Sequence, residues 1–280
     1  MIQSRTIALA EPAHQGTQQE TDQIATVGLI AYHEAGSGPA VVFLHGIGAG
    51  GAQFAAQLDA LATAGFRAIA WDMPGYGGSS PLPLESIDAL AATLGSFLRA
   101  LGLDRPVLVG HSLGGMVLLR LLSVAPHVAG RAVLSQTSAV FGSRDPAWAE
   151  KFIADRLAPL DAGHAMADLA AGMVNSMVGD SPDPAGLDRA RAGIASTPEA
   201  TFRGMILAMP GFDQRDALPR IAVPTLVLAG SRDTNAPPAG MERMAARIPG
   251  AKYVCIEGAG HLVHLEQPDR FNAVLMEFLS

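Results

Sequence analysis

The sequence predicts an α/β fold, in which a mostly parallel eight-stranded sheet carries helices on both faces. Six short apolar segments rich in β-branched residues support it, and they span residues 40–44, 68–71, 107–109, 132–134, 225–229 and 252–256. Segments of helical length separate most of them. Continuous apolar strands that alternate with helices are typical of a parallel sheet buried on both faces.

The helices are expected between these strands, at 52–63, 86–101, 113–124, 241–248 and 269–279. In the last of them Phe271, Val274, Leu275 and Phe278 follow helical spacing, and Pro268 suits the first turn. Residues 1–23 are polar and aperiodic, so they are expected to form a mobile N-terminal tail. The core should therefore comprise residues 24–137 and 211–280.

One long stretch interrupts the alternation of strands and helices. About ninety residues between the strands at 132–134 and 225–229 show no clear strand, but helix-like pieces occur at 148–157, 164–177 and 201–209. A structureless loop of that length would be unusual in a compact domain. Residues 138–210 are therefore expected to form a helical cap, inserted after the sixth strand.

Composition and charge exclude several classes of protein. Hydrophobic residues make up 49% of the 280-residue chain, which rules out a disordered polymer. The net charge of −7, with no basic run, argues against a nucleic-acid surface. No apolar run approaches the length of a membrane-spanning helix, and the single Cys255 forms no disulfide within the chain. We therefore expect a cytoplasmic protein without a membrane partner, whose oligomeric state stays open, a homodimer included.

The strongest chemical motif follows the strand at 107–109. Gly110, Ser112 and Gly114 form the pattern G-x-S-x-G between a strand and an apolar helix, which is the nucleophile elbow. The glycines permit a strained turn that exposes the serine hydroxyl. The backbone N–H of Leu113 then lies at a helix N-terminus, where it can donate to an oxyanion.

A serine needs a base and an orienting acid, and both are found downstream. Asp233 lies in the loop after the strand at 225–229, and His261 follows the last strand in the same way. In open parallel sheets, sites form outside the carboxyl ends of the strands, where all three residues are placed. The sequence therefore predicts a triad of Ser112, Asp233 and His261.

The loop after the strand at 40–44 should complete the site. Its glycines allow a backbone N–H, that of Ile47, to face the same oxyanion as Leu113. His45 is expected to be a structural hydrogen-bonding residue, and His111 a packing or pocket residue. His264 could suggest a metal pair with His261, but no third ligand stands nearby, so no metal is expected.

These motifs resemble the α/β-hydrolase fold superfamily, whose triad follows the chain order Ser, acid, His. Four stretches carry the resemblance: 44–48, 72–79, 110–115, and 258–268 with Asp233 before it. Within the superfamily, 260–268 and the two-glycine elbow are similar to 3-oxoadipate enol-lactonases and neighbouring esterases. Carbon–carbon bond hydrolases of ring-cleavage pathways typically have Trp after the catalytic histidine, where this chain has Leu262. Haloalkane dehalogenases use an Asp nucleophile, which Ser112 excludes.

The expected activity is cofactor-free hydrolysis of a small ester or lactone, with enol-lactone acids as leading substrates. The stretch expected to form the cap offers five methionines as an apolar wall: Met166, Met173, Met177, Met205 and Met209. It also offers five arginines that could hold a substrate carboxylate: Arg144, Arg156, Arg189, Arg191 and Arg203. A carbon–carbon bond hydrolase and a weakly catalytic ligand receptor on the same fold stay open as alternatives.

A dinucleotide-binding oxidoreductase is the competing class. Residues 46–51 also satisfy G-x-G-x-x-G after a strand, and Asp72 ends the next strand. That interpretation leaves Ser112, Asp233 and His261 unexplained, so we favour the hydrolase.

Overall fold

The computed structural model describes residues 1–10, 26–81, 86–142 and 146–280. Eight strands form one sheet in the order β1-β2-β4-β3-β5-β6-β7-β8. They are β1 (Gln3–Ala10), β2 (Thr26–Ala35), β3 (Ala40–Leu44), β4 (Arg67–Trp71), β5 (Val107–His111), β6 (Arg131–Ser135), β7 (Thr225–Gly230) and β8 (Lys252–Ile256). β1 pairs antiparallel with β2, and β2 pairs antiparallel with β4. In the order of the sheet, the strands β4, β3, β5, β6, β7 and β8 are all parallel to one another. The predicted α/β class and mostly parallel sheet are confirmed.

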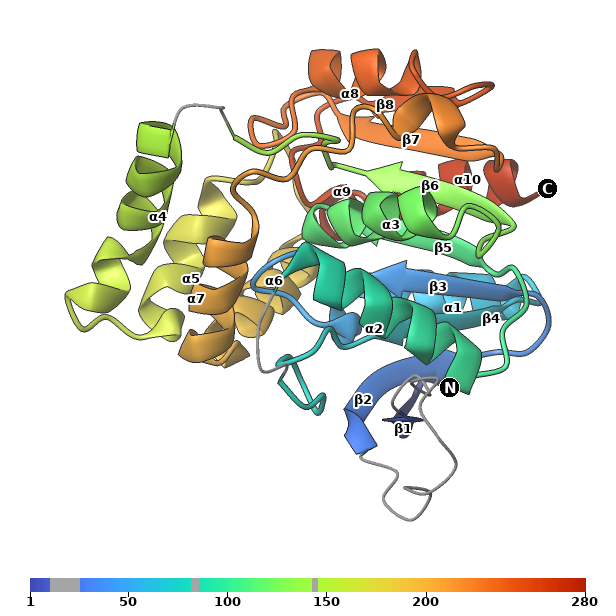
Figure 1. The fold of residues 1–280 in the computed structure, drawn as a ribbon, viewed down its shortest axis with the longest axis horizontal. Coiled ribbons are helices and arrows are strands. Elements are labelled where there is room, and N and C mark those ends of the chain that lie inside the picture. Colours follow the sequence, from blue (N-terminus) through green and yellow to red (C-terminus); the bar gives the residue numbers. More distant parts are fainter. Residues whose placement is uncertain (11–25, 82–85, 143–145) are drawn as a thin grey trace, which may run out of the picture.

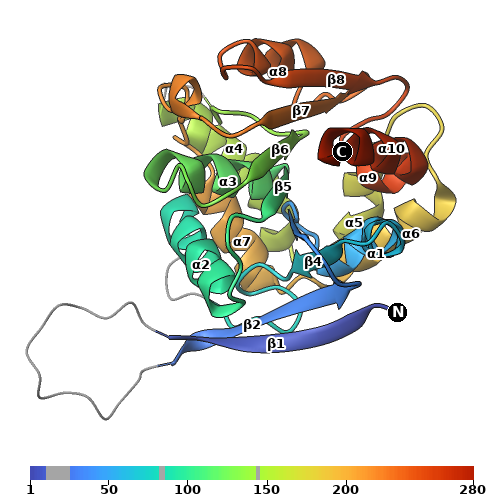
Figure 2. The same ribbon diagram turned by 90° about the vertical axis from the view of Figure 1, so that its right-hand side faces the viewer.

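Helices cover both faces of the sheet, as Figure 2 shows. The core between sheet and helices on one face contains residues of α2 (Ile87–Ala100), α3 (Leu113–Val124) and α8 (Pro238–Ala245). The core on the other face contains residues of α1 (Ala55–Thr63) and α10 (Pro268–Leu279). Strand side chains alternate between the two cores: Val42 and Leu44 of β3 face the first, while Val41 and Phe43 face the second. This double burial explains why the strands are continuous apolar runs.

Among the described residues, four α-helices lie between β6 and β7, and we call them the four-helix stretch: α4 (Pro146–Asp161), α5 (Met166–Asn175), α6 (Pro184–Ser196) and α7 (Glu199–Ala208). Figure 1 shows them beside the ends toward which the parallel strands point. Three short helices complete the fold: η1 (Gly51–Phe54), η2 (Leu218–Arg220) and α9 (Val263–Glu266). Among the described residues, no helix is both long and apolar enough to cross a membrane.

The expectation of a mobile tail is wrong for the first residues. Gln3–Ala10 form β1, which pairs along its whole length with β2 and buries Leu9. Ion pairs join Glu34 of β2 to Arg5 of β1 and to Arg67 of β4. Residues 11–23, the rest of the expected tail, lie outside the described residues.

The order in which the chain adds strands to the sheet reverses at β3. It runs from β3 to β4 on one side, and then returns to β5 on the other side of β3. The loops after β3 and β5 therefore meet at their carboxyl ends. Such a switch point is where open α/β sheets place their sites.

Candidate active site

The turn between β5 and α3 holds Ser112 in a strained conformation. Its φ of 51° and ψ of −117° lie outside the regions that L-residues usually adopt. The neighbouring glycines are required by space: a Cβ on Gly110 would lie 2.7 Å from the Gly114 carbonyl oxygen, and one on Gly114 would lie 2.2 Å from that of Leu44. The elbow therefore packs backbone against backbone, and it leaves the serine hydroxyl free to point outward.

Ser112, His261 and Asp233 form a continuous chain of hydrogen bonds. His261 Nε2 lies 2.9 Å from Ser112 Oγ, and its Nδ1 lies 2.8 Å from Asp233 Oδ2. The other carboxylate oxygen of Asp233 accepts the backbone N–H groups of Asn235 at 2.8 Å and Ala236 at 3.0 Å. Because Asp233 is buried and both of its carboxylate oxygens accept hydrogen bonds, it holds the imidazole ring of His261 with Nε2 toward Ser112.

The backbone of His261 is also held on both sides. Its N–H donates to the carbonyl of Met177, between α5 and α6, at 2.6 Å. Its carbonyl lies 2.8 Å from Nε2 of His111, which donates there in the neutral tautomer. The residues around His261 are therefore tied both to β5 and to the four-helix stretch.

Glu266 is a further residue of the site that the sequence analysis did not single out. Its buried carboxylate accepts the backbone N–H groups of Gly179 at 2.6 Å, Gly260 at 3.0 Å and Leu262 at 2.9 Å. Gly260 and Leu262 flank His261 in the chain. In the sequence Glu266 stands between Leu265 and Gln267, and this position carries no information about its backbone partners.

The two predicted oxyanion donors lie next to the serine. Leu113 opens α3, and Ile47 lines the same cavity as Ser112 and His261. A Cβ on Gly46 would lie 3.1 Å from the Ser112 Cβ, so the loop after β3 lies directly against the elbow. In the described part of the chain, neither N–H donates to a loop or side-chain acceptor.

His45 has the structural role that was expected of it. Its Nδ1 donates to the Gly46 carbonyl at 2.8 Å, and its Nε2 accepts the N–H of Met73 at 2.8 Å. Burial lowers the pKa of His45, which keeps the ring neutral and able to accept from Met73. The ring thus connects the loops that follow β3 and β4.

Two further histidines pack behind the site. Burial, reinforced by the neighbouring His261, lowers the pKa of His111 to about 3. Burial likewise lowers the pKa of His264, whose ring stacks on Phe54 with centroids 4.7 Å apart. The described residues contain no group of three His, Cys, Asp or Glu side chains placed to hold a metal ion. The ring of His264 packs against Phe54, His111 and Phe271.

A cavity of about 130 Å³ opens at the serine. Its wall from the four-helix stretch is mostly apolar and includes Phe152, Met173, Met177, Phe202, Ile206 and Met209. Of the five methionines expected as a wall, Met173, Met177 and Met209 line this cavity, while Met166 and Met205 are buried in the core. The volume is below the 300–1,000 Å³ of typical drug-sized sites, which suits a small acyl group.

Arg156 of α4 is the candidate arginine that lines this cavity. Its guanidinium lies 5.6 Å from the centroid of the Phe152 ring, and within the described residues it forms no ion pair. The other arginines pair with carboxylates: Arg189 with Asp183, Arg191 with Asp188, and Arg203 with Asp161 and Glu199. Arg144 lies outside the described residues.

The comparison with protein families agrees with the fold. Residues 39–268 match the model of the alpha/beta hydrolase fold. The chain belongs to the α/β-hydrolase fold family. This confirms the resemblance that the sequence motifs carried, and the dinucleotide-binding alternative finds no support in it.

The relatives of known sequence include esterases. A pimeloyl-[acyl-carrier protein] methyl ester esterase of Xanthomonas oryzae pv. oryzae is 32% identical over 270 residues, which cover 88% of this chain and 96% of that protein. The polyketide synthase ThaQ of Burkholderia thailandensis is 32% identical over 257 residues, but this chain spans only 12% of its length.

Similar solved structures include an esterase and a lactonase. A thermophilic esterase from Thermogutta terrifontis, solved with malate bound, has a TM-score of 0.83 and 28% identity, with 98% of both chains covered. The enol-lactonase from Burkholderia xenovorans LB400 has a TM-score of 0.80 and 25% identity, with 90% of this chain and 96% of that chain covered. Together these relatives support a hydrolase.

Proposed function

We propose that the protein is a serine hydrolase that cleaves a small ester or lactone through an acyl-enzyme on Ser112. The observation that carries the proposal is the chain of hydrogen bonds from Ser112 Oγ through His261 to the buried carboxylate of Asp233. A serine is a weak nucleophile without a base, and this arrangement supplies one with its tautomer fixed.

The first half of the reaction acylates the serine. Ser112 Oγ attacks the carbonyl carbon while His261 Nε2 takes the hydroxyl proton, and the carbonyl oxygen gains the negative charge. The N–H groups of Ile47 and Leu113 would donate to that oxygen, where each such donor can contribute a few kcal/mol. The carbon–oxygen bond of the ester then breaks, and His261 gives its proton to the departing alkoxide.

The second half releases the acid. His261 takes a proton from water, the hydroxide attacks the acyl carbon, and the proton returns to Ser112 Oγ as the acyl–serine bond breaks. Each step uses side chains that are already in contact, so no resident metal or cofactor is proposed. We infer that residues 138–210 act as the cap, because α4, α5 and α7 supply most of the apolar wall.

The decisive test is the Ser112→Ala variant. We expect kcat for short-chain aryl esters to fall by several orders of magnitude, because the members of a triad act as a unit. A fluorophosphonate probe should label the native protein stoichiometrically and leave the folded variant unlabelled. If a folded Ser112→Ala protein kept more than about a tenth of the activity, the assignment of the nucleophile would be wrong.

The substrate class follows from Arg156. Because this arginine lines the Ser112 cavity without a carboxylate partner, we propose that it binds a carboxylate on the acyl part of the substrate, as in enol-lactone acids. Arg156→Met should lower kcat/KM for the 4-nitrophenyl hemiester of glutaric acid by roughly 10- to 100-fold, because a charge-assisted hydrogen bond is lost. The rate with neutral 4-nitrophenyl pentanoate should change little.

Arg191→Met is the matched control for that experiment. Arg191 lies on α6, pairs with Asp188 at 3.0 Å and does not line the Ser112 cavity, so both esters should be unaffected. Equal losses for the charged and the neutral ester in Arg156→Met would contradict carboxylate binding.

A panel that includes 1,5-diketone ring-cleavage products decides between carbon–oxygen and carbon–carbon cleavage: faster turnover of the diketones would contradict the ester assignment.

A further inference from the structure

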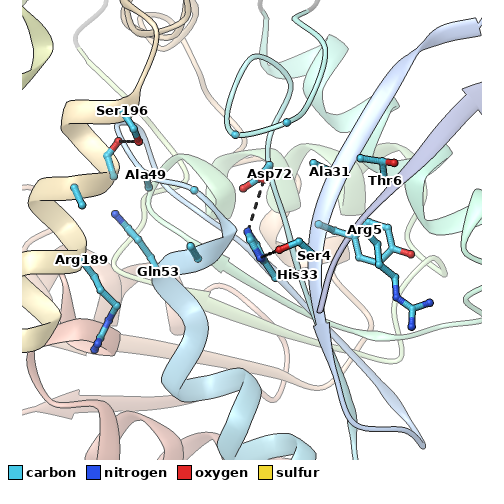
Figure 3. A pocket seen from close by; sticks show the side chains of 17 residues that line it. Ser4, Arg5, Thr6, Ala31, His33, Ala49, Gln53, Asp72, Arg189 and Ser196 are labelled. Atoms are coloured by element: carbon cyan, nitrogen blue, oxygen red, sulfur yellow. Dashed lines mark hydrogen bonds and ion pairs between the residues drawn. The ribbon is translucent and has the colours of Figure 1, made fainter. Parts of the chain in front are cut away.

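A second and larger cavity lies away from the serine. It has a volume of about 730 Å³ and opens between the β1–β2 hairpin, the loop after β4, η1 and α6 (Figure 3). We call it the hairpin cavity, and its polar lining includes Ser4, His33, Gln53, Asp72 and Arg189. Its volume is that of typical small-molecule sites. No member of the proposed triad lines it, so hydrolysis at Ser112 does not account for it.

The carboxylate of Asp72 has one engaged oxygen and one open oxygen. Asp72 is only 5% exposed, and its Oδ1 accepts the Gly51 N–H at 2.7 Å. Its Oδ2 lies 3.8 Å from His33 Nε2, too far for a hydrogen bond, and accepts none from any described residue. The Gly77 backbone packs against this side chain, because a Cβ on Gly77 would lie 2.2 Å from Oδ2 and 2.5 Å from Cγ.

Two residues of the opposite wall also carry buried polar atoms without a hydrogen-bond partner among the described residues. Figure 3 shows Gln53 and Arg189 on the side of α6, across the cavity from Ser4 and His33. Oε1 of the buried Gln53 and Nε of Arg189 have no hydrogen-bond partner within the described part of the chain. Arg189 pairs with Asp183 through Nη2 at 3.7 Å, and this ion pair leaves its Nε without a partner. Buried polar groups without partners are uncommon in folded proteins and call for a ligand or water.

One sequence motif points to the chemistry of that ligand. The glycine loop 46–51 matches G-x-G-x-x-G, and Asp72 follows Gly51 by 21 residues. The proposed hydrolysis uses only the Ile47 end of the loop, whereas Ala49 and Gly50 line the hairpin cavity beside Asp72. A carboxylate at the end of the strand that follows such a loop is suited to accept sugar hydroxyl groups.

We propose that the hairpin cavity binds a small phosphorylated sugar. The hydroxyl groups donate to Oδ2 of Asp72, and the phosphate lies against the guanidinium of Arg189, whose planar edge suits an anion. A cationic ligand fits less well, because Arg189 and His33 line the same walls as the one open carboxylate. A free sugar phosphate and a nucleotide share this chemistry. The proposal is independent of the reaction at Ser112.

Isothermal titration calorimetry with ribose 5-phosphate and with AMP tests the proposal. The native protein and Ser112→Ala should bind the same probe with equal affinity. Asp72→Asn keeps the acceptor for Gly51 but replaces the open oxygen with an NH₂ group. This variant and Arg189→Met should each raise Kd by about tenfold or more, because each loses a charge-assisted hydrogen bond. Arg191→Met, on the same helix but paired with Asp188, should leave Kd within about twofold.

The comparison of probes identifies the source of the sugar. Binding of both probes supports a sugar phosphate in general, and binding of AMP alone supports a nucleotide. 2′-Deoxy-AMP should then bind at least about tenfold more weakly than AMP, which also keeps the test decisive if Asp72→Asn does not fold. The proposal is overturned if neither probe binds at millimolar concentration, or if the Kd is the same in Arg189→Met and the native protein. Because the readout is binding, failure here leaves the hydrolase assignment untouched.

Discussion

At the scale of single residues, the role that we propose for His261 depends on how firmly its backbone is held. The carboxylate of Glu266 accepts three N–H groups, from Gly179, Gly260 and Leu262, and these connect the flanks of His261 to the segment between α5 and α6. A misplacement of about 1 Å can cost 10²-fold in rate. In the proposed mechanism Glu266 is therefore a positioning residue, because it holds the backbone beside His261 and touches no reacting atom.

We predict that Glu266→Gln lowers kcat by roughly 10- to 100-fold while KM stays within about twofold. An amide has a single acceptor oxygen, and its NH₂ group would face N–H donors, so at least one buried hydrogen bond is lost. The free energy of unfolding should fall by about 2 kcal/mol. Steady-state kinetics with an aryl ester and urea denaturation measure the two effects.

A matched control lies in the turn after β8, nine residues before Glu266. Glu257 is exposed, so Glu257→Gln should change neither kcat nor stability. Glu266→Asp keeps the carboxylate and should restore part of kcat and of the rate of fluorophosphonate labelling. A Glu266→Gln protein that melts earlier but labels at the native rate would show that Glu266 only stabilises the fold.

At the scale of elements, the sequence pattern predicted what depends on apolar periodicity. Six of the eight strands were placed within one or two residues, and the elbow with its glycines was recognised before α3. Helix α6 was missed because its buried face consists of Gly186, Ala190 and Ile194, which give little hydrophobic signal. A Cβ on Gly186 would lie 2.0 Å from the Leu265 carbonyl oxygen, so this helix packs by close backbone approach. The Asp183–Pro184 cap was the available signal.

β1 escaped prediction for a different reason. It is an edge strand whose sequence mixes Ser4, Arg5 and Thr6 with Ile7, and most of its side chains are exposed. Edge strands keep polar residues because one edge and one face meet solvent. Its pairing with β2 depends on partners such as Glu34, about thirty residues away, which a local pattern does not reveal.

The residues of the candidate site likewise fall into two groups, those that the sequence pattern located and those that it did not. Ser112, Asp233 and His261 follow strands or precede a helix, so the order of elements along the chain locates them. The partners that hold them do not follow such a rule: Met177, Gly179 and Glu266 meet around His261 only through the packing of the four-helix stretch. Which of the described candidate arginines lines the Ser112 cavity was equally inaccessible, because the answer depends on how α4 packs beside the ends of the strands.

At the scale of the whole molecule, three neutral histidines are buried around the site. Burial lowers the pKa values of His45, His111 and His264 below the ordinary value of 6.5, that of His111 to about 3. In the unfolded chain these rings take up protons near pH 6.5, whereas the folded protein does not. Stability contributed by the neutral rings is therefore complete above about pH 7 and is lost as the pH falls below about 6.5, for His111 down to about pH 3.

We predict that acid sensitivity can be reduced at His264, because neither of its ring nitrogens has a hydrogen-bond partner among the described residues. His264→Phe preserves the stacking on Phe54 and removes one group that the unfolded chain protonates. Between about pH 6 and 4.5 the free energy of unfolding should fall less steeply in the variant than in the native protein, by up to about 1.4 kcal/mol per pH unit. Urea denaturation at a series of pH values measures the difference.

Carboxylates titrate in both proteins, so their contribution cancels in that comparison. Above pH 7.5 the two curves of unfolding free energy against pH should run parallel. Identical slopes between pH 6 and 4.5 would mean that His264 already binds its proton in the folded state.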